Sequence, residues 1–154
     1  MKDQARNAAQ LIEEQRATIN ELQTPVIEVW KGILALPIVG SVDTARAQDM
    51  NERLLDRIIQ TRSEIVILDI TAVPVVDTAV AKHLLETVSS ARLLGAEVFI
   101  VGLSSRTAMT LVHLGLDLGG VITRTTLAKG LELAFDRLGL RVVSSKPSRD
   151  IRGS

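Results

Sequence analysis

The sequence predicts one α/β domain built on a mixed, mostly parallel β-sheet that begins with an antiparallel hairpin. Two short strand-like runs, 26–30 and 33–36, are separated by Lys31-Gly32, a spacing typical of a hairpin. Apolar strand-like runs then alternate with helical ones, which is the order of parallel strands joined by crossover helices. The chain has 154 residues, enough for a single domain with its own core.

The first 24 residues are predicted to form a linker or dimerisation helix ahead of this domain. Within them, residues 5–23 carry a narrow apolar seam on a polar helix, made of Ala8, Leu11, Ile12, Ile19 and Leu22. Such a seam is too thin to hold an isolated helix, and it suits either pairing with a second copy or docking onto the domain. Pro25 ends the helix, because the residue before a proline avoids the α conformation.

The elements after the hairpin are predicted from apolar spacing and from capping residues. Residues 37–41 are expected to form a loop, with Ser41 or Asp43 capping the next helix. The predicted strands are 64–70, 97–102 and a short edge strand at 121–123, with a last extended piece at 141–144. The predicted helices are 44–61, 78–94 (stopped by Gly95), Ser104 or Ser105 to 113 or 114, and Thr125 or Thr126 to 138. The polar residues 145–154 are expected to be a disordered tail.

Composition argues against several classes of function. The 18 basic and 18 acidic residues balance, so charge gives no case for binding nucleic acid or a membrane surface. Cysteine is absent, which excludes disulfides, thiolate metal sites and thiol catalysis. The amino-terminal residues lack the apolar core of a signal peptide, and no apolar run reaches the roughly 20 residues of a membrane-spanning helix. We therefore expect a cytoplasmic protein.

The common catalytic motifs for nucleotide binding, acyl transfer and zinc hydrolysis are missing. His83 is expected on a helix surface or at an interface, and His113 is expected to be partly buried and hydrogen-bonded. Asp69 and Asp77 flank a proline turn, and one reading makes them a Mg²⁺ site for phosphoryl transfer. The favoured reading makes Asp69 a hydrogen-bonding residue at the end of a strand and Asp77 a helix cap. No cofactor and no metal are therefore expected.

Thr78 is the most informative side chain of the sequence. It follows the apolar strand and the proline turn, and a helix begins immediately behind Asp77. A hydroxyl there meets the free backbone N–H groups and the positive dipole end of the helix. This position suits a regulatory phosphate better than a catalytic nucleophile.

Four stretches of the sequence, 69–81, 92–96, 114–118 and 121–130, carry a resemblance to a known family. They closely resemble the STAS domain family, and within it the RsbR-type scaffold proteins of the stressosome, a regulator of a general stress sigma factor. The resemblance covers about residues 25–140, and it implies a STAS fold over 25–144. It also implies a non-catalytic protein that binds partners, among them an RsbT-type serine/threonine kinase and an RsbS-type STAS paralogue, in a dimer or a larger homo-oligomeric assembly.

The resemblance further implies which residues are regulated. The kinase is expected to phosphorylate Thr78, and a second regulatory threonine in the next helix corresponds to Thr110. Threonine at position 78 favours the RsbR class, because RsbS-type paralogues have serine there. Two features depart from the family. Ser104-Ser105-Arg106 replaces the usual arginine-proline pair before Thr110. The family's amino-terminal sensory domain has no counterpart in residues 1–24, which is expected either of a piece of a longer protein or of a scaffold that has no sensor of its own.

The expected kinase-docking surface surrounds Thr78. It comprises Val76, Asp77, Ala79 and Lys82, together with Val75. Phosphorylation would bring negative charge to a surface suited to a neutral, partly apolar contact, and binding should weaken. The alternative function is that of a monomeric anti-sigma factor antagonist that binds an anti-sigma kinase directly.

Overall fold

The computed structural model describes residues 25–115, 121–141 and 143–145, and the predicted helix 5–23 and the tail from residue 146 lie outside these residues. One five-stranded sheet has the order β1-β2-β3-β4-β5. β1 pairs antiparallel with β2, and the other neighbours pair in parallel. The strands are β1 (Ile27–Trp30), β2 (Ile33–Val39), β3 (Ile65–Ala72), β4 (Glu97–Val101) and β5 (Ile122–Arg124). This arrangement confirms the predicted mixed sheet and its opening hairpin.

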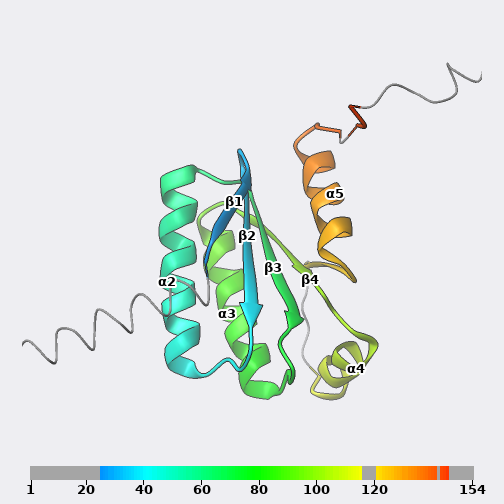
Figure 1. Cartoon of the computed structure of the whole chain (residues 1–154). Coiled ribbons are helices and arrows are strands. Elements are labelled where there is room, and N and C mark those ends of the chain that lie inside the picture. The colour runs from blue at the N-terminus through cyan, green and yellow to red at the C-terminus, as the bar shows by residue number, and fades with distance from the viewer. Residues whose placement is uncertain (1–24, 116–120, 142, 146–154) are drawn as a thin grey trace, which may run out of the picture.

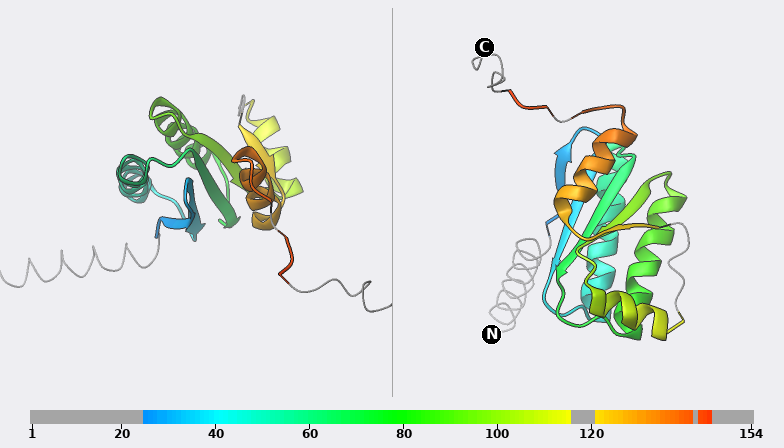
Figure 2. Two further views of the ribbon diagram at one scale, coloured as in Figure 1. Left: turned by 90° about the horizontal axis from the view of Figure 1, so that it is seen from above. Right: turned by 90° about the vertical axis from the view of Figure 1, so that its right-hand side faces the viewer.

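The helices form layers on the two faces of the sheet. They are α2 (Thr44–Thr61), α3 (Thr78–Leu93), α4 (Ser105–His113) and α5 (Leu127–Arg137). Helices α2 and α3 lie side by side over one face, and α5 lies over the other (Figures 1 and 2). The larger core lies between the sheet and α2 and α3, and a smaller core joins α5 to the opposite face.

Capping side chains fix where the helices begin. Asp43, Asp77, Ser104 and Thr126 each accept a hydrogen bond from a backbone N–H in the first turn of α2, α3, α4 and α5, respectively. Gly95 follows the end of α3 with a φ of +88°, as expected for a glycine that stops a helix. The structure thus resolves each pair of alternative caps that the sequence left open.

The predicted loop at 37–41 is partly wrong, because β2 continues through Pro37 to Val39. Pro37 is aligned with Asp69 of β3, whereas the pairing of β1 with β2 reaches only as far as Ala35. At Pro37 one side of β2 is therefore a free edge, and a residue without an N–H is tolerated there. A register shift between Pro37 and Val39 marks the same place.

Two other differences from the predicted elements exceed a single residue. β3 extends past Ile70 to Ala72, where it pairs with the unexpected end of β2 at Val39. The expected extended piece at 141–144 is not a strand in the residues that are described there, 141, 143 and 144. The elements that lead to Thr78 nevertheless lie where the sequence predicted them.

Candidate docking site at the start of helix α3

Thr78 is the first residue of α3 and is exposed. Asp77 immediately before it has extended backbone angles, and its Oδ1 accepts a hydrogen bond of 2.9 Å from the Val80 N–H. The cap satisfies one of the free N–H groups of the first turn and leaves the Thr78 side chain outside the helix. The predicted capping role of Asp77 is confirmed.

Buried valines anchor the loop between β3 and α3 to the larger core. Val73 and Val76 are part of the larger core, and the Val73 N–H donates to the Ile70 carbonyl oxygen at 3.0 Å. Val76, which we expected on the docking surface, is only 7% exposed. Its neighbour Val75 is 65% exposed, so the apolar surface beside Thr78 is formed by Val75.

The remaining residues of the expected surface are solvent-accessible. Asp77, Ala79 and Lys82 are all exposed, as is Thr78. Lys82 lies one turn of α3 beyond Thr78, on the same side of the helix. These four residues and Val75 are called the α3 tip below.

Sequence reasoning missed Val39, which is 56% exposed and belongs to the same edge of the sheet. It is aligned with Ala72 of β3, and the Gly40 N–H donates to the Ala72 carbonyl oxygen at 3.0 Å. The sequence places Val39 in the predicted loop 37–41, because a proline directly after Leu36 indicates the end of a strand. Its apolar character at the exposed end of a strand is the signal that could have revealed it.

Asp69 has the structural role that the sequence favoured. Its Oδ1 accepts hydrogen bonds from the Thr71 N–H at 3.0 Å and from the Thr71 hydroxyl at 2.6 Å. Across the described residues, no group of three or more His, Asp or Glu side chains is arranged to hold a metal ion. Both hydrogen bonds lie within the carboxyl-terminal part of β3, where the Asp69 carboxylate holds the backbone and the side chain of Thr71.

The two histidines differ in how well they were predicted. The side chain of His83 is 17% exposed on α3, and its Nδ1 lies 4.0 Å from Glu86 Oε2. His113 is exposed at the end of α4, so the expected partial burial was wrong. Only Leu111 is buried in this short helix, which leaves the flanking positions open to solvent.

Thr110 lies in the middle of α4, and its environment differs from that of Thr78. Its side chain is half-buried, and its hydroxyl donates to the Arg106 carbonyl oxygen at 2.9 Å. The helices α3 and α4 follow the neighbouring parallel strands β3 and β4, so they begin at the same edge of the sheet. The two threonines therefore belong to one end of the molecule, and Thr78 alone of the two occupies a helix start.

The chemistry available at the α3 tip is anion accommodation at a helix amino terminus. The first-turn N–H groups and the helix dipole favour negative charge there by about 0.3–1 kcal/mol. A phosphate on Thr78 would meet this favourable field while also lying next to the Asp77 carboxylate. The fold should therefore tolerate a phosphate on Thr78. The phosphate would mainly affect the binding of a partner that contacts the α3 tip.

The STAS domain family model matches residues 24–129 of the chain. The chain belongs to the STAS domain family. It is 42% identical over 130 residues to the RsbT co-antagonist protein RsbRA of Bacillus subtilis (strain 168), which covers 84% of this chain and 47% of that protein. It is 41% identical over 117 residues to RsbRD of the same organism, covering 76% of this chain and 42% of the relative. The STAS chain thus spans about half the length of these curated relatives.

Solved structures give the same fold. A single-residue variant of the RsbS protein of Moorella thermoacetica matches with a TM-score of 0.66 and 30% identity, covering 77% of this chain and 99% of that one. A chain from a structure of the molecular architecture of the stressosome matches with a TM-score of 0.60 and 29% identity, over 75% and 98% of the two chains. Within the described part of this STAS protein, no helix has the length and apolar character needed to cross a membrane.

Proposed function

We propose that this STAS protein is a non-catalytic scaffold that binds an RsbT-type serine/threonine kinase and is switched by phosphorylation of Thr78. The observation that carries the proposal is the exposed hydroxyl on the first residue of α3, directly behind the Asp77 cap. The similarity to two RsbT co-antagonist proteins supports the identity of the kinase. The output is then the cascade that controls a general stress sigma factor.

The switch works through charge at the α3 tip. Phosphorylation adds about −1.5 to −2 charges at neutral pH, and these lie beside the Asp77 carboxylate. Before modification, the exposed Val75 and Ala79 present an apolar contact next to the Lys82 ammonium group. A partner that covers this surface must desolvate the new phosphate and meets like charge if it is acidic there, so the kinase is released.

Thr110 is the second proposed phosphorylation site, with a different structural consequence. Its hydroxyl must give up the hydrogen bond to the Arg106 carbonyl oxygen before it can accept a phosphate. The modification would also place a charged group in the interior of α4, away from the helix amino terminus that stabilises an anion. We therefore propose slower phosphorylation at Thr110 than at Thr78.

The scaffold acts in an assembly. Similarity to a chain from the stressosome and to an RsbS protein supports an oligomer in which this chain meets an RsbS-type paralogue as well as further copies of itself. Such an assembly works in the cytoplasm, and no nucleic acid or membrane takes part. Many kinase-docking surfaces are then presented together, so one assembly can hold several kinase molecules.

Kinase binding by Thr78 variants tests the proposal. Thr78→Ala should keep the affinity for an RsbT-type kinase, whereas Thr78→Asp should weaken it by up to a few kcal/mol, since it imitates part of the phosphate charge. Isothermal titration of the purified proteins measures both affinities. Thr125→Asp, at an exposed threonine ahead of α5, is the matched control and should bind as the unmodified chain does. Equal affinity of Thr78→Asp and the unmodified chain would refute the switch.

A further inference from the structure

Lys82 is the one cation of the α3 tip. Its side chain is exposed, and none of the ion pairs formed among the described residues includes it. The nearest carboxylate further along the helix belongs to Glu86, which lies 4.0 Å from His83 Nδ1 instead. The Lys82 ammonium group is therefore available to a new anion on its side of α3.

Lys82 stands in a favourable position relative to Thr78. Thr78 is the first residue of α3 and Lys82 follows four residues later, so their Cβ atoms lie about 5–6 Å apart on one side of the helix. Helical side chains lean toward the amino terminus, and the Lys82 side chain therefore extends back over the turn that begins at Thr78. An anion placed four residues ahead of a lysine is also the more stabilising order, since it agrees with the helix dipole.

We propose that Lys82 is the counter-ion of a phosphate on Thr78. This inference rests on the proposed phosphorylation of that residue and assigns a partner to its charge. The ammonium group then lies between two anions, the phosphate ahead of it and the Glu86 carboxylate behind it. The phosphate carries about −1.5 to −2 charges and lies in the favoured order, so Lys82 pairs with it. Asp77 does not compete for Lys82 from the same side, because its carboxylate accepts from the Val80 N–H.

Two arginines near the same edge of the sheet are the rivals of Lys82. Arg46, in the first turn of α2, already donates from Nη1 to the Ser41 carbonyl oxygen at 2.6 Å. Arg106, in the first turn of α4, is exposed and belongs to the helix that begins beside α3. It lies on another element, whereas Lys82 shares α3 with the phosphate. Arg106 is thus the rival that the experiment has to exclude.

Titration of the phosphate by phosphorus NMR tests the pair in the full chain, with phosphothreonine incorporated at position 78 during synthesis. An adjacent cation favours the doubly charged phosphate and lowers its second pKa. Lys82→Gln should therefore move the titration midpoint upward by about 0.3 on the pH scale, as the loss of one exposed helical ion pair predicts. Lys82→Arg should keep the midpoint of the parent chain. At about 1 M salt the difference between Lys82→Gln and the parent should largely vanish, because the pair is exposed to screening.

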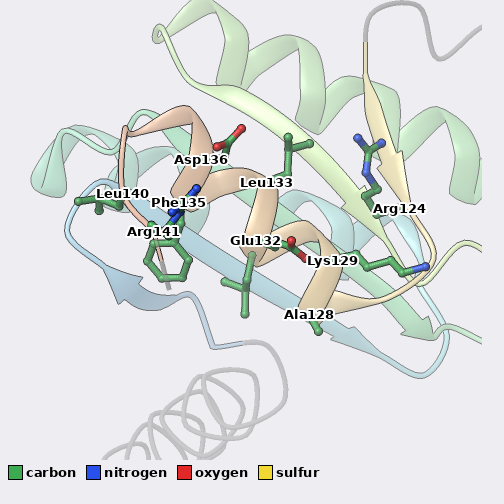
Figure 3. A pocket seen from close by; sticks show the side chains of 10 residues that line it. Arg124, Ala128, Lys129, Glu132, Leu133, Phe135, Asp136, Leu140 and Arg141 are labelled. Atoms are coloured by element: carbon green, nitrogen blue, oxygen red, sulfur yellow. The ribbon is translucent and has the colours of Figure 1, made fainter. Parts of the chain in front are cut away.

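Two further variants control for the loss of a positive charge. Lys129→Gln removes the same charge from the first turn of α5, on the opposite face of the sheet, where Lys129 lines a hollow with Glu132 and Asp136 (Figure 3). Lys129→Gln and Arg106→Gln should both leave the midpoint unchanged. An equal midpoint in Lys82→Gln and the parent would overturn the proposal, as would a larger move in Arg106→Gln than in Lys82→Gln.

The phosphate is incorporated without the kinase, so this test is separate from that of the proposed function. A midpoint that Lys82→Gln does not move, in a chain whose Thr78 the kinase does modify, would refute the role of Lys82 alone. A kinase that ignores Thr78 would refute the switch, whereas the titration would still decide whether Lys82 pairs with a phosphate there.

Discussion

At the scale of single residues, the proposed switch depends on the different roles of Asp77 and Thr78 at the start of α3. Asp77 bonds to the Val80 N–H, and Thr78 is left exposed on the outside. The sequence predicted both roles, because a short polar residue at the start of an apolar-periodic segment is a strong helix signal. It could not predict that Val76 is buried and Val75 exposed, since the direction of a loop side chain depends on the packing beneath it.

Removing the Asp77 cap should destabilise the domain modestly. Asp77→Ala leaves the Val80 N–H without its partner, and it should lower the free energy of unfolding by about 1 kcal/mol. Asp77→Asn is the matched control, because asparagine caps helices about as well as aspartate does. Urea denaturation monitored by circular dichroism measures both. An Asp77→Ala variant as stable as Asp77→Asn would show that the cap contributes nothing.

At the scale of elements, the connection after β3 is fixed by a close approach between neighbouring strand ends. Gly102 has a φ of +83°, and a Cβ atom there would lie 2.5 Å from the Thr71 nitrogen and 2.8 Å from the Thr71 Cα. Thr71 is itself held by two hydrogen bonds to Asp69. The end of β3, which leads toward Thr78, is thus packed against the turn that leads from β4 to α4.

A methyl group at Gly102 should therefore be much more damaging than one at another left-handed glycine. Gly95 has a similar φ of +88°, and a Cβ there would meet nothing within 4 Å. Gly95→Ala should cost about 1 kcal/mol through its backbone conformation alone. Gly102→Ala adds a backbone clash and should cost about 1–3 kcal/mol more. Thermal unfolding of the two variants measures the difference, and equal losses would contradict the close approach.

The order and type of the elements could be predicted from the sequence, and two strand boundaries could not. Apolar spacing and capping residues located α2 to α5 to within a residue or two. The extension of β2 beyond Pro37 and of β3 beyond Ile70 arises from pairing between the two strands, at Val39 and Ala72. Register between distant strands is a tertiary property, and a proline read in isolation indicates a loop. The missed Val39 at the candidate site has the same origin.

At the scale of the whole molecule, the scaffold and the single-chain antagonist predict different assemblies. A scaffold should elute from size exclusion as a dimer or a much larger species, since it works by presenting several docking surfaces at once. An antagonist that binds its kinase one to one should elute as a monomer. Light scattering on the eluting peak gives the mass without assumptions about shape. A monomer at every concentration would favour the antagonist.

Phosphate mapping after reaction with an RsbT-type kinase and ATP tests the central claim most directly. Mass spectrometry of the digested chain should find Thr78 as the first and most fully modified threonine, with Thr110 modified more slowly, because Thr78 is exposed at a helix start and the Thr110 hydroxyl is engaged within α4. An unmodified Thr78 in a reaction that phosphorylates other residues of the chain would contradict the account.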